Sequence, residues 1–208
     1  MKQLITPLIF TIIFTFISVQ GCGGSGADIQ NYQDPALSKY DIKTIAVLPI
    51  RNSYLNLNES KDINRYFMTG VSRKIAKFTV ISPDDAIESL NRDTLVEQYY
   101  NYLVAYSTTG IPNRELVKKL GKSIGCDAVI QGEIYNITKK DGEYGKNKGE
   151  TRCSVRYSMV STTDGKVIWE TSADAYEKTD LTFSGAPALM DVVKVGVDEI
   201  ITSMPNFK

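Results

Sequence analysis

The segment TRCSVRYSMVS at residues 151–161 decides the fold, because its apolar and polar side chains alternate. In an extended chain, successive side chains point to opposite faces. One face of this segment carries Cys153, Val155, Tyr157 and Met159, and the other carries Arg156 and Ser158. This pattern is typical of an antiparallel sheet that is buried on one side. The sequence therefore predicts an antiparallel strand over residues 151–161.

Two further strands are predicted beside this segment. Before it, residues 128–137 again bring small and apolar residues to one face. After it, Asp164 and Gly165 are a strong signal for a tight turn. The chain then returns over residues 166–175, which include Trp169. The last third of the chain is thus expected to form a three-strand antiparallel meander.

The first half of the domain shows a different pattern. Residues 44–50 are a continuous apolar run, which indicates a strand buried on both faces, and residues 78–81 predict a second one. Helices are expected from a cap at Ser60 through Ile75, and over residues 82–90, 93–106, 113–124 and 187–200. The predicted fold class is α/β (α+β), a mixed sheet with a C-terminal antiparallel three-strand meander and helices packed on it.

Composition excludes several classes of function. The chain has 24 Lys and Arg, 24 Asp and Glu, and no His. The charge balance gives no electrostatic footprint for nucleic acid, so no nucleic-acid partner is expected. Without His there is no Ser-His-Asp arrangement and no zinc site that uses His. We expect no catalytic residues, no cofactor and no metal.

Residues 1–21 are predicted to be a signal peptide. Lys2 is followed by an apolar run from residue 4 to residue 19. A transmembrane helix is the alternative, but sixteen residues cover only about 24 Å of a hydrocarbon core of about 30 Å. The run ends in VQGC at residues 19–22, which resembles the lipobox of bacterial lipoproteins. That resemblance implies cleavage between Gly21 and Cys22 and lipidation of Cys22, which would make a membrane the partner of the anchored chain.

The position of Gly23 bears on localisation. By the Gram-negative sorting rule, a residue other than Asp after the lipidated cysteine implies the outer membrane, with the domain facing the periplasm. In an organism without that sorting, the inner or single membrane is expected. Residues 22–41 begin GGSG after the cysteine and lack hydrophobic periodicity, so we expect a lipidated flexible tether. Residues 42–208 are predicted to form a single periplasmic α/β domain.

Two surface features have two interpretations each. Tyr99, Tyr102 and Tyr106 are a possible partner surface, since Tyr is enriched at interfaces; alternatively, these rings cover the domain's own core. The second feature is a basic loop, which is either a possible contact with lipid headgroups or a solvated hairpin tip. It comprises Lys139, Lys140, Lys146 and Lys148.

The two remaining cysteines are expected to be free and buried. If the hairpin turn centres near Tyr144, position 153 faces position 135. Cys126 then lies about 30 Å from Cys153 along the strand, whereas disulfide-linked Cα atoms lie within about 7 Å.

Four passages together resemble one family. They are IAVLPI (45–50), LGKSIGCDAVIQGEI (120–134), RCSVRYSMV (152–160) and TTDGKVIWE (162–170). They resemble the lipoprotein superfamily that includes the curli secretion channel CsgG, the penicillin-binding-protein activator LpoB and the TolB N-terminal domain. The resemblance implies a CsgG/TolB-N-like fold and specifies no active site. The loop at residues 138–150 is polar and lacks the lipid-facing alternation of the channel's barrel strands.

Three functions follow from these observations. The leading hypothesis is a non-enzymatic interaction module that is anchored in the membrane and binds an unknown protein of envelope assembly, transport or cell-wall machinery. The alternative is a homo-oligomer that belongs to a CsgG-like outer-membrane secretion system. The third is a hydrolase with paired carboxylates, Glu133 with Asp127 or with Glu97.

Overall fold

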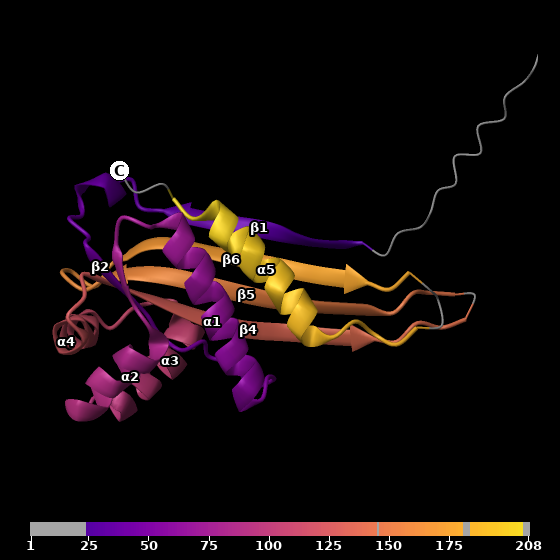
Figure 1. The fold of residues 1–208 in the computed structure, drawn as a ribbon, viewed down its shortest axis with the longest axis horizontal. Coiled ribbons are helices and arrows are strands. Elements are labelled where there is room, and N and C mark those ends of the chain that lie inside the picture. Colours follow the sequence, from indigo (N-terminus) through magenta and orange to yellow (C-terminus); the bar gives the residue numbers. More distant parts are fainter. Residues whose placement is uncertain (1–23, 145, 181–183, 206–208) are drawn as a thin grey trace, which may run out of the picture.

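The computed structural model describes residues 24–144, 146–180 and 184–205 (Figure 1). The strands are β1 (Ser25–Gln33), β2 (Thr44–Val47), β3 (Thr79–Ile81), β4 (Ala128–Lys140), β5 (Glu150–Ser161) and β6 (Val167–Lys178). The helices are α1 (Leu57–Lys74), α2 (Pro83–Arg92), α3 (Val96–Thr109), α4 (Arg114–Ile124) and α5 (Leu189–Ser203), with one 3-10 turn at Leu37–Lys39. None of the helices in these ranges is long and apolar enough to cross a membrane.

The strands form one mixed sheet in the order β1-β6-β5-β4-β2-β3. Strand β5 is antiparallel to both β4 and β6, so the predicted meander is confirmed. Strand β2 runs parallel to both β3 and β4. The α+β class is therefore confirmed, with the parallel strands at one side of the sheet and the meander at the other.

Helices cover the two faces of the sheet unequally. Helices α1 and α5 pack on one face, where Phe67, Tyr157 and Trp169 are fully buried. Helices α2, α3 and α4 lie on the other face, over a second core that includes Leu120 and Val129. In Figure 1 these three helices gather at one end of the sheet. The rest of that second face, over β1, β6 and β5, carries polar side chains; we call it the outer face.

Strand β1 corrects the expectation of a flexible tether over residues 22–41. Residues 25–33 pair antiparallel with β6, from Ser25 opposite Glu177 to Gln33 opposite Trp169. Ala27 and Ile29 pack against the main core. Only these two inward positions are apolar, so the segment shows little periodicity of its own. Pairing with β6, far away in sequence, makes it a strand.

Helix α1 begins earlier than expected. Asn56, not Ser60, is the cap: its side chain accepts hydrogen bonds from the backbone N–H of Asn58 and Glu59. The Glu59 carboxylate in turn accepts from the Asn56 N–H at 2.9 Å. This reciprocal pair is a capping box, which satisfies donors that the first helical turn leaves open.

The β4–β5 hairpin differs from the predicted register by one residue, because Ser154 and not Cys153 faces Tyr135. A bulge follows Tyr135, and Asn136 there has a φ of 51°. The expectation of free, buried thiols is confirmed for Cys126 and Cys153. They belong to the cores on opposite faces of the sheet.

Candidate functional site

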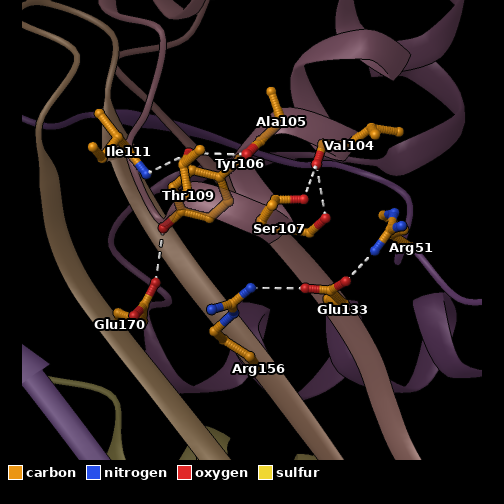
Figure 2. A network of polar contacts seen from close by, with 11 residues as sticks. Arg51, Val104, Ala105, Tyr106, Ser107, Thr109, Ile111, Glu133, Arg156 and Glu170 are labelled. Carbon is orange, nitrogen blue, oxygen red and sulfur yellow. Dashed lines mark hydrogen bonds and ion pairs between the residues drawn. The ribbon is translucent and has the colours of Figure 1, made fainter.

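A network of charged side chains lies where α3 meets the outer face. Glu133 on β4 accepts a hydrogen bond from Arg156 Nη2 on β5 at 2.7 Å and also pairs with Arg51 Nη1. Figure 2 shows the Glu133 carboxylate between the two guanidinium groups. The Glu133 side chain is 14% exposed, and those of Arg51 and Arg156 are 35% and 22% exposed.

The backbone places each member of this network. Glu133 and Arg156 are directly opposite each other in the β4–β5 ladder. Arg51 follows β2 and continues its parallel pairing with β4: its N–H donates to the Gly132 carbonyl, and its carbonyl accepts from the Ile134 N–H. The ion pairs therefore join β2 to the meander at the middle of the sheet.

Tyr106 connects helix α3 to this network. Its hydroxyl donates to Glu170 Oε2 on β6 at 2.8 Å (Figure 2). The Arg156 guanidinium lies 5.8 Å from the centroid of the Tyr106 ring and 5.7 Å from that of Tyr135. Burial lowers the pKa of Arg156, but the Glu133 hydrogen bond and the Glu170 charge outweigh it, so the pKa is raised overall. Burial is the largest cause of the raised pKa of Tyr106.

The cavity beside this network is very small. It measures about 20 Å³, and Tyr106, Gln131 and Ser158 are part of its lining. Gln131 is 3% exposed, and neither of its amide atoms has a hydrogen-bond partner among the described residues. A volume of this size holds about one water molecule. The network is therefore suited to joining α3 to the sheet, and this cavity beside it is large enough for about one water molecule only.

The three tyrosines predicted as a possible partner surface are instead buried. Tyr99, Tyr102 and Tyr106 are 4%, 4% and 5% exposed, so they cover the domain's own core, as the alternative interpretation expects. The interpretation as an exposed partner surface is wrong for these side chains. Burial is the main reason that the pKa of Tyr102 rises to about 12. On the same helix, Tyr100 is 64% exposed.

Glu133 and Asp127 do not meet as a pair of catalytic carboxylates. Glu133 lies six residues after Asp127 along an extended strand, or about 20 Å, whereas glycosidase carboxylates lie about 5–9.5 Å apart. Asp127 Oδ2 accepts from the backbone N–H groups of Lys43 and Thr44, both at 2.9 Å, which is a structural role. Glu97 is exposed in the first turn of α3. The pairing of Glu133 with Asp127 is therefore wrong.

The predicted basic loop forms the end of the β4–β5 hairpin. Lys139, Lys140 and Lys146 are exposed, and Lys148 is half-buried. Carboxylates are interleaved with them, and Lys146 Nζ lies 2.6 Å from Glu143 Oε1. Gly21 and Cys22 lie outside the described residues. Within the described ranges, no group of three His, Cys, Asp or Glu side chains is arranged to hold a metal ion.

Two open grooves meet beside α3 and α4. One, of about 380 Å³, runs between Tyr32 of β1, Glu170 and the α3–α4 loop. The other, of about 410 Å³, runs between α3 and α4. Ile111 lines both grooves and is 72% exposed, and Tyr32 is 50% exposed. A larger groove of about 600 Å³ between α1 and α5 is lined mainly by charged and polar side chains.

The sequence analysis missed Arg51, Glu170 and Ile111. Arg156 was placed on the polar face of its strand, but its partner Glu133 depends on the hairpin register, which was off by one residue. Ile111 lies in a loop outside any periodic segment, so no sequence pattern marks it as exposed.

Comparison with known proteins finds no matching family model and no matching curated protein. Solved structures do match. A PelC dodecamer from Paraburkholderia phytofirmans is similar at a TM-score of 0.50 and 14% identity, over 85% of this chain and 95% of that chain.

Two further solved structures are similar at lower TM-scores. Lipoprotein GNA1162 from Neisseria meningitidis has a TM-score of 0.41 and 19% identity, over 77% of this chain and 99% of that one. The LpoB C-terminal domain from Salmonella enterica has a TM-score of 0.38 and 17% identity, over 67% and 92%. What the comparisons establish is a shared fold: this chain has the mixed-sheet architecture of the PelC subunit over most of both chains.

Proposed function

We propose that this protein is a lipid-anchored lipoprotein of the bacterial cell envelope that works by binding another protein and not by catalysis. The lipobox-like VQGC at residues 19–22 supports the anchor. The fold shared with PelC is compatible with this role but does not specify it. Because Gly23 follows the cysteine, we propose the outer membrane, facing the periplasm, as the location in a Gram-negative organism.

The binding role rests on the exposed Ile111, which lines both grooves. We call Ile111 and the surface around it, between the two grooves, the Ile111 ridge. A large aliphatic side chain that is 72% exposed, beside Tyr32 at 50%, gives an apolar contact surface. Charged side chains, among them Asp34, Arg114 and Lys166, line the groove around it. An apolar centre within a charged rim is the usual anatomy of a protein interface. We propose that the partner is an envelope protein that covers this ridge.

Lipidation is tested by metabolic labelling with palmitate. The parent should incorporate label and fractionate with membranes, and Cys22→Ser should lose both properties. Cys126→Ala is the control, because it removes a thiol of the folded domain and should leave the label in place. An unlabelled parent would refute the anchor.

Partner binding is tested by pull-down from solubilised envelopes after crosslinking. Ile111→Asp places a charge on the ridge and should remove a partner that the parent recovers. Leu57→Asp is the matched control, because Leu57 is 71% exposed at the start of α1. A partner recovered equally with both variants would show that the ridge is not the binding surface.

A homo-oligomer is the second candidate, and the structure described as a PelC dodecamer is the observation that favours it. In that case the Ile111 ridge would contact another copy of this chain. Light scattering on the lipidated protein in detergent should then give a mass several times that of one chain. A monomer or dimer over the accessible concentration range would exclude a ring.

A further inference from the structure

The folded domain begins almost directly after the proposed lipid site. The Lys178 N–H donates to the Gly24 carbonyl at 3.0 Å, so the chain is held to the sheet from its first described residue. Cys22 precedes Gly24 by two residues, and consecutive Cα atoms are about 3.8 Å apart. Two such steps span at most about 7.6 Å, which is the greatest length of chain that can separate the proposed lipid site from the folded domain.

The attachment point belongs to one particular end of the sheet. Lys178 is opposite Glu150, the first residue of β5, and Glu150 is opposite Lys140, the last residue of β4. Gly24, Lys178, Glu150 and Lys140 thus form one row across four strands. With strands about 4.8 Å apart, the row spans about 14 Å. We call this row, with residues 139–144 and 146–150 of the hairpin, the anchor end.

The helices on the second face gather at the opposite end of the sheet. A Cβ atom added to Gly165, just before β6, would lie 2.5 Å from the Arg114 Cα atom, so the start of α4 packs there. Strand β6 extends from Val167 to Lys178, which at about 3.3 Å per residue is about 36 Å. Figure 1 shows α4 at one end of the sheet and the β4–β5 hairpin at the other.

The anchor end has the polar character of a surface that faces lipid headgroups. Lys139, Lys140 and Lys146 are exposed there. Residues 139–150 contain four lysines and three carboxylates, so the net charge is close to neutral. Because attraction to anionic lipid is weak for such a mixture, the short tether must supply the contact.

We propose that the anchor end rests on the bilayer surface, with the strands rising from it and α4 and the Ile111 ridge held away from the membrane. This inference depends on the proposed lipidation of Cys22. The acyl chains of a lipidated Cys22 would leave the bilayer only at a large hydrophobic cost, and two residues of chain give the domain little freedom to tilt or drift. The lysines at positions 139, 140, 146 and 148 then face the headgroups, because the lipid is attached to the chain beside this end of the sheet.

The orientation is tested with two variants of the full lipidated protein, each with one added cysteine that carries an environment-sensitive fluorophore. Lys146→Cys reports on the anchor end, and Lys119→Cys, on exposed α4, is the matched control with the same change of charge. The native Cys126 and Cys153 can stay, because they are 7% and 2% exposed. The protein is reconstituted into vesicles of phosphatidylethanolamine and phosphatidylglycerol that contain a lipid with a nitroxide on its headgroup.

We expect several-fold stronger quenching at position 146 than at position 119. Inserting a Gly-Ser linker of about 20 residues before Gly24, with a typical span of about 25 Å, should remove most of that difference while the protein stays bound to the vesicles. Equal quenching at both positions in a palmitate-labelled parent would overturn the orientation but not the anchor. Strong quenching at position 146 that survives the linker would overturn the role of the tether. A parent without palmitate would overturn the proposed function itself.

Discussion

Replacing Gly132 by Ala should destabilise the domain, although alanine is usually the better residue in a strand. Gly132 lies on β4 opposite Tyr157 of β5. A Cβ atom at position 132 would lie 2.7 Å from Cζ and 2.8 Å from Cδ1 of the Tyr157 ring. The ring is 1% exposed and stacks on Phe67 of α1, with centroids 3.7 Å apart, so it has little room to retreat.

The magnitude follows from two opposing terms. Overpacking a filled core costs about 1–3 kcal/mol, and replacing a strand glycine gains about 0.5–1 kcal/mol. The steric term is the larger, so we expect a net loss of about 1–2 kcal/mol in the free energy of unfolding. For a domain of this size, each kcal/mol lowers Tm by about 2–4 °C.

Urea denaturation followed by circular dichroism would measure this loss. Gly185→Ala is the control, because the nearest atom to its new Cβ is Asp141 Oδ1 at 3.8 Å, an ordinary contact. Tyr157→Ala alone should cost about 3–5 kcal/mol, and combined with Gly132→Ala it should cost clearly less than the sum. A Gly132→Ala variant as stable as the parent would refute the argument.

Three further predictions concern stability. Glu133→Gln should lower the free energy of unfolding by about 1–3 kcal/mol, because two partly buried guanidinium groups lose their carboxylate. Glu143→Gln, at the exposed hairpin tip, is the control and should change it by less than about 0.5 kcal/mol. Equal losses for the two variants in urea denaturation would contradict this prediction. Burial raises the pKa of Cys126 and Cys153 from 9.0 to about 12, so their stabilising contribution is complete below pH 9 and is lost as the pH rises from 9 toward 12. Replacing both thiols by Ala should flatten that alkaline decline, and an unchanged slope would count against it. Asn56→Ala removes the capping box of α1 and should lower the free energy of unfolding by about 1 kcal/mol, with a lower helix signal at intermediate urea; no change would show that the cap contributes nothing.

The sequence predicts the fold well where periodicity is strong. The alternation within residues 151–161 predicts which side chains of this central strand are buried. That prediction does not depend on the partner strand, so an error of one residue in the hairpin register leaves it unchanged. The bulge that shifts that register contains Asn136, which has a positive φ, and an isolated asparagine carries no sequence signal for a bulge. The partner of Arg156 could therefore not be assigned correctly.

Strand β1 and the exposed ridge show why the rest was not predictable. Ala27 and Ile29 are too few to mark a strand, and β1 exists because β6 offers it an edge about 150 residues later in the chain. The exposure of Ile111 depends on the path of the loop between α3 and α4, and on how these two helices pack together. Both features arise from contacts between distant segments, and local patterns do not encode such contacts.

If the chain is exported as proposed, the pairing of β1 with β6 also sets an order of events during export. A chain that leaves the cytoplasm N-terminus first delivers residues 25–33 to the periplasm before the other described strands, yet the strand with which they pair spans Val167–Lys178. Pairing two segments that lie so far apart in the sequence is slow compared with the formation of local structure. The segment next to Cys22 thus stays unpaired until nearly the whole polypeptide has emerged. During that interval, the peptidase and acyltransferase that the proposed lipidation of Cys22 requires would have access to the cysteine before the sheet holds its neighbours in place.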